Sequence, residues 1–349
     1  MFLPKRGNGI MNGKNNDIDF VLAWVDGNDP EWRKEKNKYC ATKNQDDSDA
    51  RYIDLDLLRY WFRAIEKYAP WVRKIHFVTC GHYPEWLNRE HPKLNLVKHS
   101  DFIPSQYLPV FSANPIELNF HRIKGLSERF VYFNDDFYLN APVTPDDFFV
   151  NGLPLDVAAM NAYSFDDDAR KVTDLILVND MYVINRHFNK KTCIKANLSK
   201  WYHPGYGKYN VSNALLMLWP KFTGIKPMHI PSSFLKKTYT EVWAAEPDVL
   251  NETCMHRFRD SSDVNQWLFL FWQMAKGDFY PRNVKDFHYF PLRTNHEDNQ
   301  LLYHALIEDQ YKMICINDGQ TEDSFDEVKR KLHKIYQKKL PRQSKFELP

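Results

Sequence analysis

The chain has 349 residues, and its 43% of hydrophobic and 15% of aromatic residues are enough for a substantial core without disulfide or metal staples. The 47 basic residues almost balance the 45 acidic ones, so the net charge of +2 provides no field for binding nucleic acid. This composition also excludes a disordered chain, a collagen-like repeat and a coiled coil.

Strands and helices alternate over the first 150 residues. Short apolar runs rich in strand formers predict strands at 18–25, 74–79, 94–97 and 129–133. Helical spacing and helix-compatible polar stretches predict helices at 31–39, 55–69 and 117–126. Such alternation indicates an α/β fold with a mostly parallel or mixed sheet flanked by helices.

The pattern is less regular in the rest of the chain. We expect an irregular inserted subregion at about 151–225, containing one short strand at 181–184, and later a helix at 263–275. No proline-glycine linker separates two domains. Residues 17–325 are therefore expected to form one domain, preceded by a flexible polar N-terminus at 1–16.

The sharpest local signal is Asn134-Asp135-Asp136 at the end of an apolar strand. Two adjacent carboxylates on such a turn repel each other unless a cation or strong donors lie between them. Carboxylate oxygens suit hard cations, so Asp135 and Asp136 are candidate ligands for Mg²⁺ or Mn²⁺ held against a diphosphate. The alternative is an ordinary Asx turn or a helix N-cap.

Two further places carry acidic residues in suitable positions. Asp26, Gly27 and Asp29 follow the first strand, where α/β proteins bind ligands, and they are either nucleotide-binding residues or turn formers. Glu117 stands at the expected start of a helix, where its charge either complements the helix dipole or serves a site. Taken alone, each of these residues has a structural explanation.

His229 and Arg259 are isolated candidates in the second half of the chain. His229 lies between Pro227 and Pro231 on an expected rigid loop, which suits a positioned acid or base. Arg259 precedes a predicted helix, where a guanidinium can clamp a phosphate. A single histidine is weak evidence by itself, because the chain has 13 and most histidines are structural or lie on the surface.

In combination, these residues resemble the conserved blocks of the Stealth family, in the same order along the chain. The segments that carry the resemblance are Ile18–Val21, Trp24–Asp29, Arg51–Tyr52, Leu57–Tyr60, Pro115–Glu117, His121–Ile123, Phe133–Asp136, Met228–Pro231, Arg259–Asp263 and Ile314–Asp318. We compare Met228–Pro231 with the family's third block and Arg259–Asp263 with its fourth. The resemblance covers roughly residues 17 to 320 and is far more specific than any single motif.

The family includes bacterial capsular and receptor-polysaccharide phosphotransferases, and the catalytic subunit of the lysosomal-enzyme N-acetylglucosamine-1-phosphotransferase. The resemblance implies a Rossmann-like, nucleotide-sugar-transferase-like fold. It also implies an enzyme that moves a hexose 1-phosphate from a UDP-sugar to a sugar hydroxyl, forms a phosphodiester in a cell-surface polysaccharide and releases UMP. By this resemblance Glu117, Asp136, His229 and Arg259 fall on catalytic positions, with Asp135 beside them.

Two other classes of function stay open from the residues. A metal-dependent glycosyltransferase uses the same kind of sheet and strand-end aspartates but releases UDP. A non-catalytic carbohydrate-binding protein would stack the many aromatic residues on sugars, but it needs neither an acidic turn nor a separate histidine and arginine. The nucleotide product separates the two enzymes, and turnover itself separates both from a binding protein.

The ends of the chain bear on where the protein acts. Residues 1–17 lack the apolar core of a signal peptide, and the longest apolar run is far short of the ~20 residues that span a bilayer. With five widely spaced cysteines that predict free thiols, we expect a cytoplasmic protein. The basic tail at 326–349 has eight Lys and Arg residues and an apolar stripe. It either contacts the inner face of the bacterial membrane, near a lipid-linked saccharide acceptor, or packs on the domain.

Overall fold

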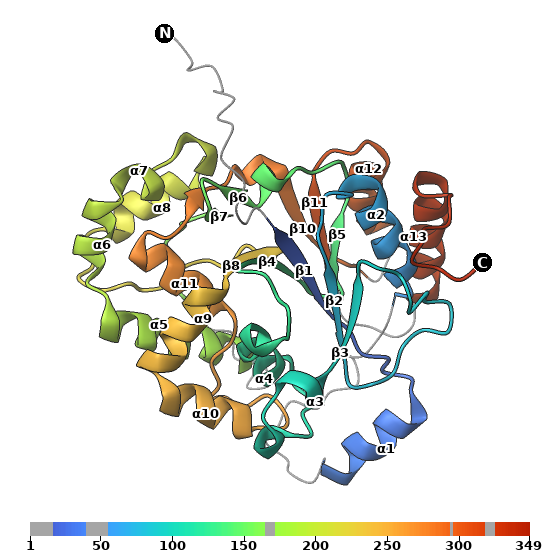
Figure 1. Cartoon of the computed structure of the whole chain (residues 1–349). Helices are drawn as coiled ribbons and strands as arrows, with labels where there is room; N and C mark the ends of the chain where they lie inside the picture. The colour runs from blue at the N-terminus through green and yellow to red at the C-terminus, as the bar shows by residue number, and fades with distance from the viewer. Residues whose placement is uncertain (1–16, 40–54, 165–171, 294–295, 318–324) are drawn as a thin grey trace.

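A five-stranded sheet forms the centre of the computed structural model, which describes residues 17–39, 55–164, 172–293, 296–317 and 325–349 (Figure 1). Its strands in spatial order are β3 (Leu94–Lys98), β2 (Ile75–Thr79), β1 (Ile18–Ala23), β4 (Arg129–Phe133) and β8 (Ser232–Leu235). The first four are parallel, and β8 runs antiparallel to β4. The flexible N-terminus expected at 1–16, and Arg51, Tyr52 and Asp318 of the family resemblance, lie outside the described residues.

The four strands predicted in the first half of the chain are confirmed within one or two residues at each end. Every residue of β2 is buried, as are the first five residues of β1. Strands covered on both faces read as nearly continuous apolar runs, which is why the sequence signal was strong here. The order of the parallel strands brings the carboxyl ends of β1 and β4 to the same edge of the sheet.

Two smaller sheets extend the central one. The first consists of β10 (Phe287–Pro291), β11 (Met313–Asn317) and β5 (Phe137–Leu139), and the second of β6 (Phe149–Val150), β7 (Leu153–Asp156) and β9 (Tyr280–Pro281). Since β5 follows β4 after a short turn, the first small sheet is attached to the carboxyl edge of the central sheet. Cys315 of β11 pairs with Phe137 at the start of β5.

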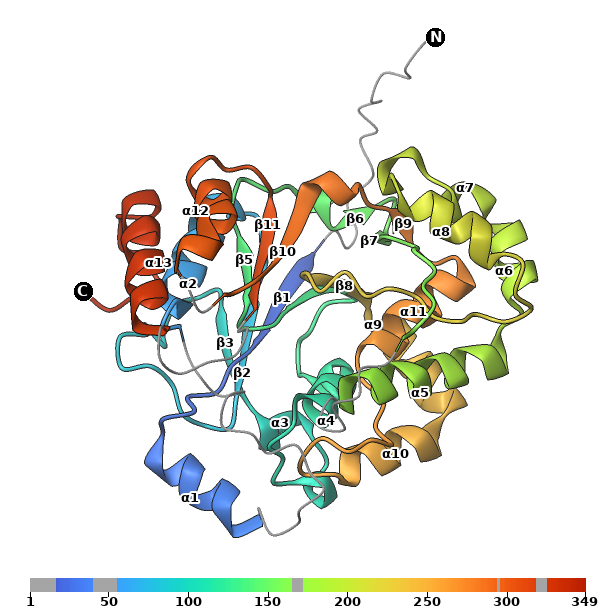
Figure 2. The ribbon, with the colours of Figure 1, turned by 180° about the vertical axis from the view of Figure 1, so that it is seen from behind.

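Helices cover both sides of these sheets (Figures 1 and 2). In chain order they are α1 (Pro30–Tyr39), α2 (Leu58–Tyr68), α3 (His99–Phe102), α4 (Ala113–Leu118), α5 (Val172–His187), α6 (Lys190–Ala196), α7 (Leu198–Trp201), α8 (Tyr209–Leu216), α9 (Lys236–Ala245), α10 (Pro247–Met255), α11 (Trp267–Lys276), α12 (Gln300–Ile307) and α13 (Phe325–Lys339). Helices α2, α12 and α13 lie at one end of the molecule, and α5 to α8 lie at the other. Apart from its last residue, α11 is entirely buried, as its apolar sequence predicted.

Three expectations about local structure were wrong. The helix expected at 117–126 is α4, which begins earlier because Ser112 caps it by accepting a hydrogen bond from the backbone N–H of Asn114. Glu117 therefore lies in the last turn of a helix and not at its start. The strand expected at 181–184 is part of α5, and the stretch expected to be irregular at 151–225 is largely helical. Apolar runs of this length do not distinguish a buried strand from a buried helix.

The C-terminal residues pack on the domain. The apolar stripe of α13 is buried, with Leu332 0% and Tyr336 1% exposed. The ring of Tyr336 stacks on Tyr60 of α2 at a centroid distance of 5.4 Å, and Arg63 forms a bidentate ion pair with Glu347 at 2.8 Å. The alternative of a packed stripe is therefore the one that the structure shows. Among the described residues, no helix has the length and apolar character needed to cross a bilayer.

Candidate active site

The site forms where several chain segments meet at the carboxyl edge of the central sheet. The turn of residues 134–136 joins β4 to β5, and the start of β8 lies beside it because Ser232 pairs with Tyr132. The segment before β8 carries His229. Residues Cys315 and Asn317 come from the end of β11, the neighbour of β5. Three segments far apart in the sequence therefore deliver side chains to one point.

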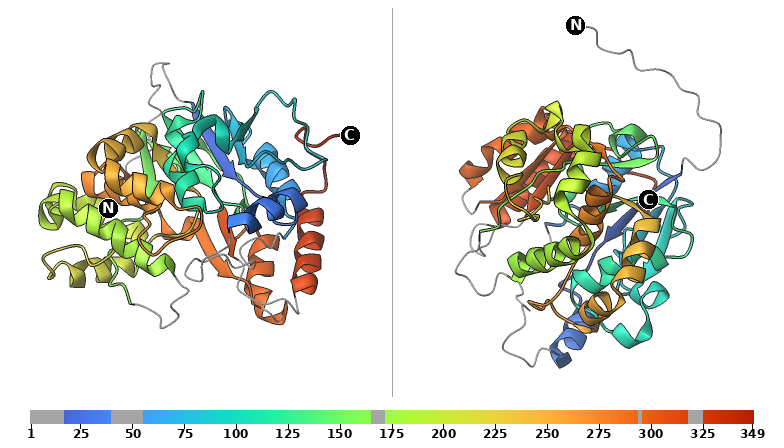
Figure 3. Two further views of the ribbon diagram at one scale, coloured as in Figure 1. Left: turned by 90° about the horizontal axis from the view of Figure 1, so that it is seen from below. Right: turned by 90° about the vertical axis from the view of Figure 1, so that its left-hand side faces the viewer.

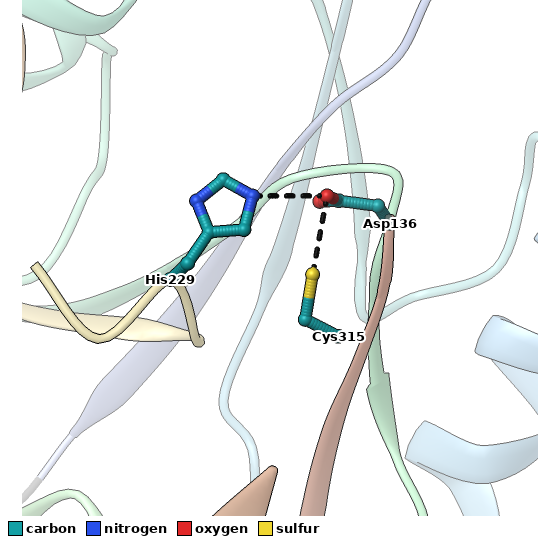
Figure 4. A group of neighbouring side chains, drawn as sticks. All are labelled: Asp136, His229 and Cys315. Atoms are coloured by element: carbon teal, nitrogen blue, oxygen red, sulfur yellow. Dashed lines mark hydrogen bonds and ion pairs between the residues drawn. The ribbon is translucent and has the colours of Figure 1, made fainter. Parts of the chain in front are cut away.

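Asp136 is the centre of this group (Figure 4). Its Oδ2 atom lies 3.1 Å from Nε2 of His229, 3.3 Å from Sγ of Cys315 and 3.2 Å from Nδ2 of Asn317. Its backbone carbonyl accepts a hydrogen bond of 2.9 Å from the N–H of Ile316. One carboxylate oxygen thus accepts from three side chains, and the backbone of the turn is tied to β11.

The two carboxylate oxygens of Asp136 have different surroundings. Burial by itself would raise the pKa of Asp136, but the hydrogen bonds and charge of His229, with the bonds from Asn317 and Cys315, outweigh burial and hold the pKa below its ordinary value. Asp136 is therefore ionised at neutral pH. The second oxygen, Oδ1, is buried without a hydrogen-bond partner. A buried carboxylate oxygen without a donor is a natural ligand for a cation.

His229 is held in a restricted position. Its φ angle of 50° lies in the left-handed region, which non-glycine residues rarely adopt outside functional sites and turns. The ring meets Phe137 edge-on at 5.2 Å and Tyr289 at 5.5 Å between centroids. Because a carboxylate only accepts, the bond to Asp136 places the hydrogen of the neutral ring on Nε2. Nδ1 then keeps its lone pair and can accept a proton.

Glu117 reaches the same turn through Tyr132. The hydroxyl of Tyr132 lies 2.9 Å from Oε1 of Glu117 and 2.9 Å from Oδ1 of Asn134. Burial raises the pKa of Glu117, against the opposing effects of Tyr132, the charge of Arg259 and the charge of His229. The Tyr132 hydroxyl can donate its hydrogen to Oε1 of Glu117 or to Oδ1 of Asn134, so Tyr132 bridges the two residues. Glu117 is thus connected to the turn that carries Asp136.

Arg259 lies on the loop between α10 and α11, close enough for its charge to act on Glu117. Its guanidinium is half-buried and forms no hydrogen bond or ion pair with any described residue. The loop is fixed by Asp263, which is 0% exposed and accepts from His256 Nδ1 at 2.7 Å and Asn114 Nδ2 at 2.8 Å. Asp263 therefore ties the loop of Arg259 to α4, the helix that carries Glu117. The helix predicted from 263 begins only at Trp267, because Asp263 serves this loop.

The loop after β1 makes a separate cluster. Asp29 caps α1, accepting from the backbone N–H groups of Glu31 and Trp32 at 2.9 Å each, and its other oxygen lies 3.3 Å from Nδ1 of His82. The backbone N–H of Asp26 donates to Nε2 of His82 at 2.8 Å. No hydrogen bond among the described residues joins Asp26, Gly27 or Asp29 to Asp136. These contacts are those of turn formers, and nucleotide binding by this loop stays a prediction.

The residues present fit a divalent cation at Asp136. Asp136, His229 and Cys315 each offer one ligand atom, and these atoms lie within 4.8 Å of one another. The unpartnered Oδ1 of Asp136 suits a hard cation, whereas imidazole and thiol are softer donors, so the donor set does not choose between Mg²⁺ and Mn²⁺. Asp135 is exposed at the tip of the turn and is not part of this group. Its role as a metal ligand stays a prediction.

The structure brings the four residues predicted to be catalytic into one neighbourhood. His229 and Arg259 are both within electrostatic reach of Glu117, and His229 contacts Asp136 directly. Residue-by-residue reasoning missed the supporting contacts of Tyr132, Asp263, Cys315 and Asn317. Cys315 and Asn317 stood in the last segment of the family resemblance, which was the one signal that could have found them.

Comparisons with known proteins identify the family of the chain. Conserved regions 1, 2 and 4 of Stealth proteins match residues 16–42, 51–155 and 304–349. The comparison of Arg259–Asp263 with the fourth block was therefore wrong, and Ile314–Asp318 is the segment that lies in region 4. His229 and Arg259 lie between regions 2 and 4.

Relatives match along nearly their whole length. A capsular polysaccharide phosphotransferase WcwK of Streptococcus pneumoniae is 41% identical over 95% of this chain and 98% of its own. The receptor polysaccharide phosphotransferase WefC of Streptococcus gordonii is 42% identical over 95% and 99%. The exopolysaccharide phosphotransferase cps2G of Lactiplantibacillus plantarum is 37% identical over 95% and 96%. The solved glycosyltransferase GlyE of Streptococcus pneumoniae gives a TM-score of only 0.22, at 10% identity over 94% of this chain and 90% of its own, and carries no argument. The chain belongs to the Stealth family, among relatives that are polysaccharide phosphotransferases.

Proposed function

We propose that the protein transfers a hexose 1-phosphate from a UDP-sugar to a hydroxyl of a saccharide acceptor in cell-surface polysaccharide synthesis, and releases UMP. The observation that carries this proposal is the combination of the Asp136–His229 pair with the unpartnered guanidinium of Arg259 beside Glu117. Phosphoryl transfer depends on positioning and on neutralising charge, more than on covalent chemistry by the protein. The Asp136–His229 pair would position the reacting groups, and Arg259 would neutralise the charge of the phosphate.

In this proposal His229 is the base. Asp136 orients the ring and stabilises the imidazolium that forms when Nδ1 accepts the proton of the acceptor hydroxyl. The acceptor oxygen then attacks the phosphorus atom that bears the hexose, and the bond from that phosphorus to UMP breaks. Phe137 and Tyr289 hold the ring of His229 in place, so the side chain loses little conformational entropy when the acceptor binds.

Arg259 is the proposed clamp for the transferred phosphate. Its guanidinium has no partner among the described residues, so it can form two parallel hydrogen bonds to phosphate oxygens without first breaking a bond. Burial raises the pKa of Glu117 beside it, which weakens the competition of this carboxyl group with the phosphate for Arg259. Through Tyr132, Glu117 also positions the turn of Asn134 and Asp136.

A divalent cation, Mg²⁺ or Mn²⁺, completes the proposal. Asp136 would hold it through Oδ1, and Asp135 is the second candidate ligand on the same turn. When bound, such a cation neutralises charge on the diphosphate of the donor. The uridine part of the donor would lie at the loop of Asp26, Gly27 and Asp29, at the same edge of the sheet.

The nucleotide product tests the proposal. The purified full chain is incubated with Mg²⁺ or Mn²⁺, a saccharide acceptor and, in turn, UDP-glucose, UDP-galactose and their N-acetyl forms, and the products are separated by anion-exchange chromatography. Release of UMP with a new phosphodiester signal in the ³¹P spectrum of the acceptor is the expected result. Release of UDP would show the rival glycosyltransferase reaction and would overturn the proposal. Donor binding without either product would instead indicate a binding protein.

A further inference from the structure

The middle of the chain has an unusual charge distribution that the proposed reaction does not explain. Residues 181–240 contain no Asp or Glu and ten Lys and Arg residues. The whole chain has a net charge of +2, so the rest of it carries a net charge of −8. The ten cations are Arg186, Lys190, Lys191, Lys195, Lys200, Lys208, Lys221, Lys226, Lys236 and Lys237. The positive charge is therefore concentrated in one segment of a nearly neutral protein.

The same segment exposes large apolar side chains. Leu198 on α7, Val211 and Leu215 on α8, and Leu218 and Trp219 after α8 are between 50% and 79% exposed, and Leu218 is the most exposed of all large apolar side chains among the described residues. Val211 and Leu215 are four residues apart and so lie on one face of α8. An exposed apolar group of this kind, rimmed by polar residues, marks an interaction surface.

The orientation of α8 is fixed from the inside. Asn213 is fully buried, and its side chain bonds to the backbone carbonyls of Ala158 and Trp201 and to the backbone N–H of Met160. This anchor holds the opposite face of the helix, with Val211 and Leu215, toward solvent. The exposure of the apolar residues is thus a consequence of a well-bonded helix and not of a loosely packed one.

Exposed cations are carried by α6, by the residue before α8 and by the segment after α8. Lys191, Lys195, Lys208 and Lys221 are exposed, and none of them forms an ion pair with an acidic side chain in the part of the chain that the structure describes. Arg186, by contrast, is paired with Glu246 at 3.2 Å. Helices α6, α7 and α8 lie together at one end of the molecule (Figure 1). We call their exposed cationic and apolar residues the α6–α8 surface, which comprises Lys191, Lys195, Leu198, Lys208, Val211, Leu215, Leu218, Trp219 and Lys221.

We infer that the α6–α8 surface docks the protein on an anionic lipid bilayer. Apolar side chains that enter the region between headgroups and acyl chains, a tryptophan suited to the interface, and lysines that face anionic headgroups are the three components of interfacial binding. A second copy of the chain fits poorly, because a two-fold interface would bring the same lysines together. A nucleic acid would use the cations but not the exposed leucines.

The α6–α8 surface lies on the side of the molecule from which the chain segment of His229 comes, so docking there would bring a membrane-bound acceptor toward the site. From Trp219 the chain runs through Lys226 directly to His229. Helix α13, which carries the basic residues of the C-terminal tail, lies at the opposite end of the molecule (Figures 1 and 3). Docking through α6–α8 rather than through α13 would bring a lipid-linked acceptor to the side of the molecule from which the segment of His229 comes. The bilayer contact itself does not depend on the proposed reaction.

Co-sedimentation of the full chain with vesicles tests the inference. Vesicles of phosphatidylcholine with 30% phosphatidylglycerol are compared with vesicles of phosphatidylcholine alone, at low salt. Three double variants are used: Leu218→Ser/Trp219→Ser, Lys195→Glu/Lys208→Glu, and, as the matched control on α13, Lys334→Glu/Lys338→Glu. Both lysine pairs are exposed and both lower the net charge by the same amount. Thermal melts check that every variant is folded.

We expect the wild type and the α13 control to bind the anionic vesicles with similar affinity, and each α6–α8 variant to bind at least tenfold more weakly. Binding of the wild type should also fall on raising the salt, and on vesicles without phosphatidylglycerol. An equal loss in the α13 control would show that net charge or the tail is responsible, and would overturn the inference. So would absence of vesicle binding by the wild type, or a dimer in solution that Leu218→Ser/Trp219→Ser dissociates. None of these outcomes bears on the nucleotide product, so the proposed reaction is tested separately.

Discussion

The Nε2 atom of His229 lies 3.1 Å from Oδ2 of Asp136, although the two residues are 93 positions apart in the sequence. The same carboxylate oxygen also accepts from Cys315 and Asn317 on β11. The bond fixes which nitrogen of His229 carries the hydrogen, and the three donors keep Asp136 ionised. Asp136 therefore links His229, the proposed base, to the end of β11, and the same carboxyl group is the candidate cation ligand.

Replacing His229 removes the proposed base. We expect His229→Ala to lower turnover at least ~100-fold, which corresponds to about 2.7 kcal/mol of transition-state stabilisation. UMP release under saturating donor is the measurement. His304→Ala, which changes an exposed histidine of α12, is the control and should retain full turnover. Near-normal turnover in a folded His229→Ala protein would remove this residue from the mechanism.

Replacing Asp136 should abolish both orientation of His229 and cation binding. Asp136→Asn keeps the size of the side chain but removes its charge, so we expect at least a ~100-fold loss of turnover. EDTA should stop the wild-type enzyme, and added Mg²⁺ or Mn²⁺ should restore it. Titration of Mn²⁺, followed by electron paramagnetic resonance, should show a bound ion in the wild type and none in Asp136→Asn. Asp135→Asn measures in the same assay how far the exposed neighbour contributes. Full turnover in EDTA would rule out the cation.

Replacing Glu117 should lower the activity of the protein but raise its stability. Burial raises its folded-state pKa, so the folded protein binds this proton more tightly than the unfolded chain does, and stability falls as the pH rises through that pKa. We expect Glu117→Gln to lower turnover but to raise the melting temperature, with a larger gain at pH 8 than at pH 5. Glu85→Gln, at an exposed glutamate, should change neither. A lower melting temperature for Glu117→Gln at pH 8 would contradict the buried, uncharged state.

The effect of replacing His256 should also depend on pH, but here the replacement should destabilise the protein, and most strongly at low pH. The hydrogen bond that His256 donates to Asp263 raises the pKa of His256, against burial, so the pair stabilises the fold fully below the ordinary histidine pKa. That contribution is lost as the pH rises through the raised value. We expect urea unfolding to show His256→Gln less stable than the wild type at pH 5.5, with the difference shrinking by pH 9. A difference that grows with pH would show that the pair is not charged.

We expect Asp263 to act as a positioning residue for Arg259, and a double-mutant cycle tests this expectation. Asp263→Asn should weaken turnover by loosening the loop, while the control Asp248→Asn at an exposed position on α10 should not. Arg259→Ala should lower turnover more strongly than Asp263→Asn. If Asp263 acts through Arg259, the double variant should lose little more than Arg259→Ala alone. Additive losses would mean that Asp263 acts on the reaction independently of Arg259.

Local signals in the sequence located the four parallel strands of the central sheet. Strands β1, β2, β3 and β4 were predictable because each is a short run of strand formers bounded by turn residues. The failures occurred where a local pattern fits more than one structure. Met181 to Ile184 reads as a strand by composition, but these residues belong to α5, which packs against α11 and buries Met181, Val183 and Ile184. Only that tertiary contact decides between the two structures. Helix α4 was misplaced because its cap, Ser112, precedes the apolar pattern.

For the site, too, the sequence determined some features and the tertiary structure decided the others. The sequence alone determined which residues to suspect, because Asp136 ends a strand, His229 stands between prolines, and the family resemblance linked them to Glu117 and Arg259. It could not determine that Asp136 bonds Cys315 and Asn317, since that contact depends on β5 pairing with β11 in one register. Nor could it show that the apolar stripe of the C-terminal tail is buried while the apolar residues of α8 are exposed. Both stripes have helical spacing, so the local pattern is the same. Whether a stripe is buried depends on which neighbouring element covers that face of the helix. Only the assembled tertiary structure decides this.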